Sequence, residues 1–160
     1  MVDRHRVIDL LTKHEGFRAT CYRDTVGKLT IGIGFNLDAA GAELRCIAAE
    51  LDYAALRGGQ AITLEQAQAL LAEGIQSAQD VATITVPGFP EMPDNVQLVI
   101  IDMIFNLGSA GFHRFHVMIA ALIDHDWLRA ANAMRASLWY GQVGVRATND
   151  IALLLGAAAV

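Results

Sequence analysis

Cysteine is scarce in this chain of 160 residues, which contains only Cys21 and Cys46. A small scaffold held together by disulfides needs more, so we expect two reduced thiols packed as small apolar side chains. Basic residues are also few, because 12 Lys and Arg stand against 17 Asp and Glu, for a formal net charge of −5. Contacts to duplex nucleic acid rest on clustered Lys and Arg, so this balance excludes duplex nucleic acid as a partner.

Long hydrophobic runs are missing near both ends of the sequence. Between Arg6 and Thr12 there are only five mostly apolar residues. A secretory signal needs an apolar run of roughly 7–15 residues. The apolar tail from Ile151 to Val160 has about half of the roughly 20 residues that a membrane span requires. We therefore expect synthesis in a host cytoplasm, with a separate route to any target outside it.

Apolar spacing changes along the chain, and the changes predict an α+β fold that is mostly α. Residues 4–14 have the spacing of one helix face, with Asp3 as N-cap and Gly16 as the stop. From Phe17 to Gly34 the period changes to two, which predicts strands. One or two short helices are expected over residues 38–57.

The remainder of the chain is expected to be helical on both sides of one loop. Thr63 and Gln66 form a capping-box pattern before a helix whose apolar spacing continues to Val81. All three prolines fall within residues 87–93, which we expect to be a loop. A buried helix is expected over 96–107, followed by three shorter helices near 112–123, 127–138 and 146–156.

Length and composition bound the domain organisation. A chain of 160 residues with 54% apolar residues is typical of one globular domain. We therefore expect a single domain over residues 1–160. Within it we expect a small β lobe at about 12–60, a connecting helix at about 63–82 and a helical lobe at about 94–160.

The helix expected over 96–107 has nine apolar residues among twelve, and its polar exceptions include Asp102 and Asn106. Asp102 and Asn106 are four residues apart, so they share one helix face. Buried polar groups cost stability unless they are paired. This face therefore either borders a wet cleft, with Phe105 beside it, or holds two polar side chains that are satisfied inside the core.

Glu15 stands where the first helix is expected to end, just before Gly16. The helix dipole is negative at that end and disfavours a carboxylate by roughly 0.3–1 kcal/mol. A general acid, which must keep its proton until it reacts, would suit this position. The alternative is a solvated surface Glu beside a terminating glycine.

Asp24 and Thr30 fall on one face of a hairpin only if its loop is the three residues 25–27. They are then diagonal neighbours about 7–8 Å apart, which lets a carboxylate and a hydroxyl hold one water between them. Gly32 and Gly34 would continue this face without side chains and leave room for a bulky substrate. A two-residue loop would place Asp24 and Thr30 on opposite faces.

Residues 14–17, 22–25, 27 and 30–34 read HEGF, YRDT, G and TIGIG. With eight and then five residues between Glu15, Asp24 and Thr30, these segments resemble the active-site motif of the phage-type lysozymes, glycoside hydrolase family 24. Two later blocks are similar to the family's central helix and late motif, namely FNLG at 105–108 and the Trp, Gln, Gly and Arg-Ala positions within 138–147.

This resemblance implies a two-lobed lysozyme-like fold and a muramidase, as in the endolysins of T-even phages. Such an enzyme cleaves the β-1,4 bond between N-acetylmuramic acid and N-acetylglucosamine in peptidoglycan. Glu15 would be the acid, and Asp24, helped by Thr30, would position or activate a water, so inversion at the anomeric carbon is expected. Arg146 matches the family's arginine near the catalytic Glu, where an ion pair would orient that carboxyl.

Two positions depart from the family pattern. The residue after Gly34 is often His or Arg in the family, whereas Phe35 followed by Asn36 stands here. We expect packing at the cleft lip, or a sugar contact, to differ accordingly. No cofactor and no metal are expected, because the pair His113 and His116 has no third ligand at a telling spacing.

Peptidoglycan is the expected partner, and the chain is expected to be a monomer that acts on the periplasmic cell wall. A free endolysin would need a partner that opens the membrane, whereas a virion-borne domain would be carried to the wall. Two other functions stay open. A lytic transglycosylase needs a catalytic Glu but no water-positioning Asp, and it forms anhydro products. A non-enzymatic wall-binding or tail module would bind the wall without releasing reducing ends.

Overall fold

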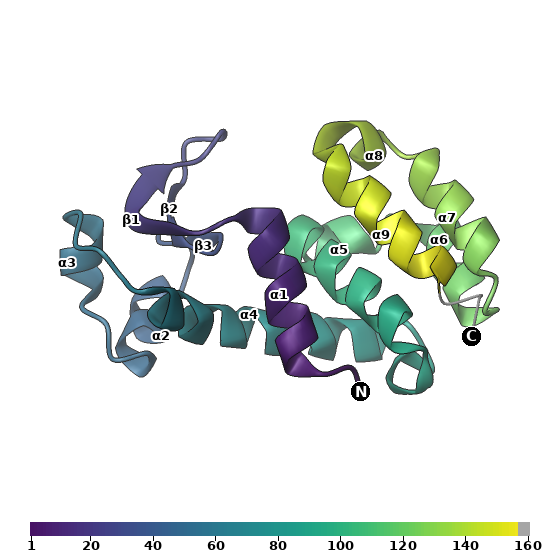
Figure 1. Cartoon of the computed structure of the whole chain (residues 1–160), viewed down its shortest axis with the longest axis horizontal. Helices are drawn as coiled ribbons and strands as arrows, with labels where there is room; N and C mark the ends of the chain where they lie inside the picture. The colour runs from purple at the N-terminus through teal and green to yellow at the C-terminus, as the bar shows by residue number, and fades with distance from the viewer. Residues whose placement is uncertain (157–160) are drawn as a thin grey trace. The chain divides into compact units, whose positions relative to one another are not determined.

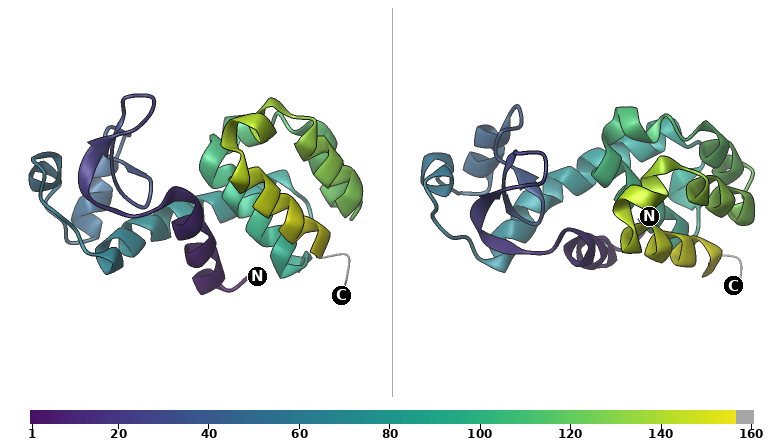
Figure 2. Two further views of the ribbon diagram at one scale, coloured as in Figure 1. Left: turned by 45° about the horizontal axis from the view of Figure 1, so that its top comes forward. Right: turned by 90° about the horizontal axis from the view of Figure 1, so that it is seen from above.

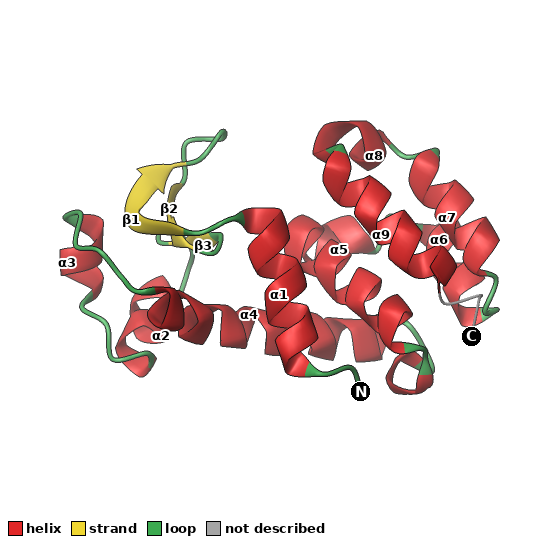
Figure 3. Ribbon diagram, in the orientation of Figure 1, coloured by secondary structure: helices red, strands yellow, loops and turns green. Residues whose placement is uncertain are grey.

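The computed structural model describes residues 1–156, and it confirms the predicted α+β class with helices predominating (Figure 3). The chain divides into two compact units, Ile8–Gln76 and Met1–Val7 with Ser77 onward. Two helices, α1 (Arg4–Glu15) and α4 (Leu64–Thr85), each begin in one unit and end in the other (Figure 1). We describe each unit by itself.

The unit Ile8–Gln76 contains an antiparallel sheet in the order β1-β2-β3. Tyr22 pairs with Thr30 across its first hairpin. Asp24 N–H donates to the Lys28 carbonyl over 2.9 Å, and Gly27 takes a left-handed φ of 85°. The predicted three-residue loop is thereby confirmed. The strands are β1 (Arg18–Arg23), β2 (Leu29–Gly32) and β3 (Phe35–Asn36).

The second hairpin of this sheet was not predicted. The alternating pattern was expected to continue to Gly34, but β2 ends at Gly32 and the chain turns through Gly32–Gly34, so that Ile31 pairs with Phe35. Gly32 and Gly34 have φ of 66° and 67°, a left-handed region that residues with a side chain rarely adopt. The two glycines therefore make a tight turn rather than an open strand face.

Short helices complete this unit. They are α2 (Ala42–Ala48) and α3 (Tyr53–Arg57), within the range predicted for one or two helices. Asp38 ties the sheet to α3, because its carboxylate accepts from Leu29 N–H and from Arg57, each over 2.8 Å. Those two hydrogen bonds lower the pKa of Asp38. Both predicted thiols, Cys21 and Cys46, are free.

The helix α4 begins with the predicted capping box. Thr63 N–H donates to Gln66 Oε1 over 2.9 Å, and Gln66 N–H donates to Thr63 Oγ1 over 3.1 Å. The following 87–93 segment is not wholly a loop as predicted, because it contains the short 3-10 helix η1 (Phe89–Glu91), with proline in its first turn. Proline fits there because the first helical turn needs no N–H donor from it.

The core of the other unit, Met1–Val7 with Ser77 onward, is α5 (Asp94–Phe112). Its residues 96–104 are all buried. By length and composition alone α5 is the one helix within 1–156 that could cross a membrane, but 56% of its most apolar window is buried inside the protein, as in a core helix. Gly108, with φ 70° and ψ 167°, kinks the helix. The glycine-rich segment after Leu107 was expected to separate two helices, and Gly108 does break α5 into two helical stretches, although the second stretch resumes at once and continues to Phe112.

Four helices follow α5, one more than predicted. The extra one is α8 (Leu138–Val143), which lies where the sequence predicted the end of one helix and a glycine-rich separator. The last helix, α9 (Val145–Gly156), lies beside both α5 and α7 (Trp127–Arg135) (Figure 2). The remaining helix of the four is α6 (His116–Ile123).

Candidate active site

Glu15 is the last residue of α1, as predicted. Gly16 ends the helix with a left-handed φ of 73°, and its N–H donates to the Thr12 carbonyl over 2.9 Å. The half-buried Glu15 side chain lies against the backbone of Gly34, since a Cβ built on Gly34 would come within 3.0 Å of Glu15 Oε2. The turn after β2 thus meets the carboxyl at the end of α1.

Asp24 is fixed at the tip of the first hairpin. Its Oδ1 accepts from Val26 N–H over 3.0 Å and from Lys28 N–H over 2.8 Å. Hydrogen bonds from backbone amides to a carboxylate are charge-assisted and hold it in one orientation. The loop therefore presents Asp24 as a fixed acceptor, with both of these hydrogen bonds made to Oδ1.

Thr30 lies diagonally from Asp24 across the hairpin, in the predicted register. Its side chain is buried, with 5% of the residue exposed. Its Oγ1 donates to the Lys28 carbonyl over 3.2 Å, so the hydroxyl proton is directed to a strand neighbour. A hydroxyl that donates once still has lone pairs that accept from a water.

The two residues that depart from the family pattern have local partners. Phe35 is 9% exposed, and the Arg45 guanidinium lies 5.2 Å from the centre of its ring. Little of that ring is left for contact with a sugar. Asn36 is half-buried, and its Oδ1 accepts from Asp38 N–H over 2.8 Å.

The room for substrate expected beside Gly32 and Gly34 does not exist. A Cβ on Gly32 would lie 3.0 Å from Ala67 Cβ and 3.2 Å from Ile62 Cδ1, because α4 and the segment before it pack directly on that glycine. At Gly34 the space is occupied by Glu15. The expectation was wrong because both glycines belong to a turn that other side chains cover.

In the other unit, Arg146 forms a buried ion pair with Asp102. Arg146 Nε donates to Asp102 Oδ2 over 2.7 Å, and Nη2 donates to Oδ1 over 2.9 Å. Asp102 is fully buried and Arg146 is 8% exposed. Of the two interpretations of the polar face of α5, the satisfied core group is correct for Asp102. The role expected for Arg146 beside Glu15 stays a prediction.

Asn106, the second polar residue of that face, is exposed and accepts from Trp139 Nε1 over 2.8 Å. Its partner Trp139 lines a groove of about 530 Å³, and Phe105 is half-buried. The groove lies within one unit and has a mainly apolar lining that includes Leu107, Phe115, Val117, Leu138 and Trp139.

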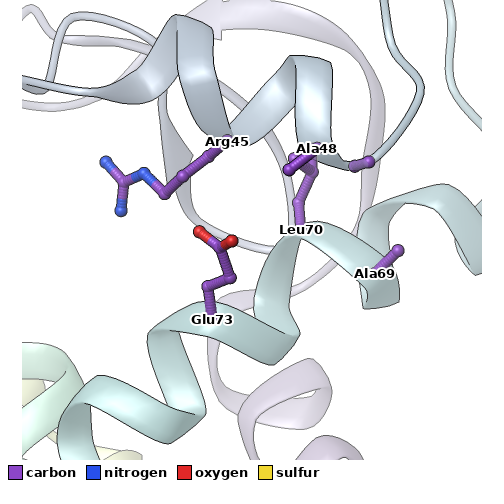
Figure 4. A pocket seen from close by; sticks show the side chains of 6 residues that line it. Arg45, Ala48, Ala69, Leu70 and Glu73 are labelled. Atoms are coloured by element: carbon purple, nitrogen blue, oxygen red, sulfur yellow. The ribbon is translucent and has the colours of Figure 1, made fainter.

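A smaller pocket of about 110 Å³ lies between α2 and α4. The Glu73 carboxylate points toward the Arg45 side chain, and Ala48, Ala69 and Leu70 also line this pocket (Figure 4). None of Glu15, Asp24 or Thr30 lines it. We assign this pocket no part in the chemistry.

Comparison with protein families gives a match to the phage lysozyme model over residues 12–148. The chain belongs to the phage lysozyme family. This family comprises glycosidases that hydrolyse peptidoglycan, and membership supports that role here. The family assignment made from the HEGF, YRDT and TIGIG segments is thereby confirmed.

Curated relatives of this phage lysozyme chain are distant. The pre-baseplate central spike protein Gp5 of enterobacteria phage T4 is 28% identical over 155 residues, which are 92% of this chain and 27% of the spike protein. The chain thus spans about a quarter of the length of that relative. The probable T4-type lysozyme 1 of Dictyostelium discoideum is 24% identical over 159 residues, and 91% of each chain is covered.

Sequence reasoning missed a second buried carboxyl in this phage lysozyme. Asp150 is fully buried on α9, and neither of its oxygens has a hydrogen-bond partner among residues 1–156. One of them lies within 4.8 Å of an Asp102 carboxylate oxygen. The sequence did hold an indication of this carboxyl, because Arg146 and Asp150 are four residues apart and therefore share one helix face.

The environment of Asp150 keeps it protonated. Burial first, and then the charge of Asp102, raise its pKa to about 9, against the opposing effect of Arg146. This value lies above the ordinary 3.8, so between about pH 4 and 9 the folded chain holds a proton that the unfolded chain has lost. The contribution of Asp150 to the free energy of unfolding is therefore fully present below about pH 4, and it is lost as the pH rises toward about 9.

We expect Asp150→Asn to stabilise the protein increasingly as the pH rises. The amide has nearly the shape of the protonated acid and can donate to Asp102, but it cannot ionise. Thermal unfolding at pH 5 and pH 8.5 measures the difference in melting temperature between variant and wild type, which should grow with pH. The exposed Asp9→Asn is the control. If the difference in melting temperature between Asp150→Asn and wild type were the same at both pH values, Asp150 would not be protonated in the folded protein.

Proposed function

We propose that the chain is an N-acetylmuramidase that cleaves the β-1,4 bond between N-acetylmuramic acid and N-acetylglucosamine. One observation carries the proposal. The hairpin register places Asp24 and Thr30 on one face, and the turn that follows this hairpin lies against the Glu15 carboxyl. A proton donor and a fixed acceptor on one small unit are the two groups that glycoside hydrolysis requires.

In the proposed reaction, Glu15 gives its proton to the glycosidic oxygen as the bond from that oxygen to the anomeric carbon breaks. A water attacks the anomeric carbon from the opposite face and loses a proton to Asp24. The Asp24 carboxylate is suited to this step because two backbone amides hold one of its oxygens in place. Thr30 supplies a further acceptor for the same water.

The test is release of reducing ends from purified peptidoglycan, followed together with turbidity. We expect soluble fragments that carry free reducing sugars. Anhydro products without reducing ends would make the chain a lytic transglycosylase. Binding to peptidoglycan without release of fragments would make it a wall-binding module.

We predict that hydrolysis inverts the anomeric centre. A retaining enzyme attacks with the carboxylate itself, whereas an inverting enzyme keeps room for a water between the two carboxyls. Asp24, held by two amides at a hairpin tip, is built to orient a water rather than to move onto carbon. Proton NMR of the sugar released in the first minutes should show the α-anomer. A β-anomer would instead identify Asp24 as a nucleophile.

For deployment we propose delivery by a phage particle to the periplasmic cell wall. The support is the 28% identity with a baseplate spike protein, which covers 92% of this chain. Release through the membrane by a separate membrane-opening protein is the other route. Detection of the chain by mass spectrometry in purified virions supports the first route, and its absence there with presence in infected cells supports the second.

A further inference from the structure

The turn between β2 and β3 has an unusual neighbour. Ile31 and Phe35 pair on either side of it. At Gly34, the three atoms nearest to an added Cβ all belong to one side chain: Glu15 Oε2 at 3.0 Å, Cδ at 3.3 Å and Cγ at 3.3 Å. A Cβ essentially never comes closer than 3.0 Å to another heavy atom. The Glu15 side chain therefore lies in tight contact with the point that a Cβ at position 34 would take, and it would have to give by a few tenths of an ångström to admit one.

This contact differs from that of the neighbouring glycine. A Cβ on Gly32 would meet the apolar side chains Ala67 and Ile62, so that glycine allows α4 to pack closely on the sheet. Gly34 allows the close approach of an acidic side chain from the end of α1. Gly16 follows Glu15 with a left-handed φ of 73°, so the chain leaves the helix immediately after the carboxyl.

We propose that Gly34 is a positioning residue, which acts by letting the Glu15 side chain lie against the β2–β3 turn. This inference rests on the proposed role of Glu15 as the proton donor. The backbone of the turn blocks Glu15 conformers on one side, and a proton donor must lie within about 2.6–3.2 Å of the atom that it protonates. A Cβ at position 34 requires Glu15 to move by a few tenths of an ångström, and a displacement of about 1 Å at a reacting group costs on the order of 10²-fold in rate, so a smaller loss is expected here.

A methyl group at position 34 has two separate effects, which a matched control distinguishes. The first is backbone strain, because φ at Gly34 is 67°. Gly41 has φ 76° with nothing within 4 Å of an added Cβ, so Gly41→Ala introduces similar strain without a clash. The second effect is displacement of Glu15, which only Gly34→Ala produces.

The kinetic experiment compares Gly34→Ala, Gly41→Ala and wild type on soluble peptidoglycan fragments. For Gly34→Ala we expect kcat to fall about 3- to 30-fold, with KM changed less than about threefold. The alkaline limb of its kcat/KM profile, which reports the protonated acid, should also move. Gly41→Ala should keep kcat within twofold and the same pH profile. A Gly34→Ala enzyme with wild-type kcat and pH profile would overturn the proposal.

A stability cycle tests the contact without any activity measurement. In wild type, Gly34→Ala should lower the melting temperature more than Gly41→Ala does. In a Glu15→Ala background the clash is gone, so the two losses should become equal. If Gly34→Ala does not fold, the double variant Glu15→Ala/Gly34→Ala should fold. The proposal would be overturned if Gly34→Ala still lowered the melting temperature more than Gly41→Ala in the Glu15→Ala background. It would also be overturned if the double variant stayed unfolded.

The two measurements also separate this inference from the function on which it rests. Should wild type release no reducing ends, the proposed muramidase activity fails, while the melting temperatures still decide whether Gly34 holds Glu15. Conversely, active wild type with an inactive Glu15→Gln and an unimpaired Gly34→Ala supports the muramidase and refutes the positioning role.

Discussion

Glu15→Gln should abolish nearly all turnover on peptidoglycan while the protein stays folded. Glutamine has the shape of the protonated acid but has no proton to give to the leaving sugar oxygen. General acid catalysis contributes about 10²–10⁴-fold to such a step, and a sugar alkoxide is a poor leaving group without it. The measurement is the rate of reducing-end release at pH 6–7, with the melting temperature taken on the same samples.

The control for this variant is Glu65→Gln, the same chemical change on an exposed side chain in the same unit. It should keep full activity. Because Glu15 is half-buried and not part of the core, the melting temperature of Glu15→Gln should stay within a few degrees of wild type. More than about a tenth of wild-type activity would remove Glu15 from the mechanism.

Local chemistry made the first hairpin predictable. A left-handed Gly27 and the Asp24 side chain, which bonds to amides two and four residues ahead, specify the loop without help from the remainder of the chain. The second hairpin was missed because Gly32 and Gly34 alternate with apolar residues just as a strand does. What distinguishes them from strand residues is close contact with Ala67 and Glu15, which come from distant segments of the sequence.

In the helical unit, too, local sequence did not predict an element that tertiary contacts stabilise. The sequence predicted a separator around Gly141, where α8 forms instead. Ser137 caps that helix by accepting from Tyr140 N–H, and Trp139 is buried with its Nε1 bonded to Asn106. This tertiary packing outweighs the roughly 1 kcal/mol by which glycine disfavours a helix.

The site itself was predictable to the extent that it is local. Glu15 is marked by its place before Gly16, and Asp24 and Thr30 by the loop length between them. The partner of Arg146 was not predictable in this way, because Asp102 lies 44 residues earlier on another helix. Nothing in local spacing distinguishes a carboxylate that faces a cleft from one that neutralises a buried arginine.

Removal of Asp102 should have the largest effect on stability of any single carboxyl that we describe. Asp102→Ala leaves the guanidinium of Arg146 buried without its bidentate partner, and loss of one member of a buried pair typically costs about 3–5 kcal/mol. We expect about 3 kcal/mol, at the lower end, because Asp150 is close enough to ionise in its place once the Asp102 charge is gone. Urea unfolding at pH 7 measures the loss.

Two further variants test that explanation. Asp94 is also on α5 and also pairs with an arginine, Arg6, but both side chains are about half exposed, so Asp94→Ala should cost at most about 1 kcal/mol. Asp150→Asn stabilises the wild-type protein at pH 7, yet it should destabilise Asp102→Ala, because it removes a buried carboxyl that can neutralise Arg146 once Asp102 is gone. The effect of Asp150→Asn on the free energy of unfolding should therefore change sign between wild type and Asp102→Ala. That change is expected only if Asp150 can replace Asp102 as the negative partner of Arg146. A double variant as stable as Asp102→Ala would show that Asp150 does not take over the charge of Arg146.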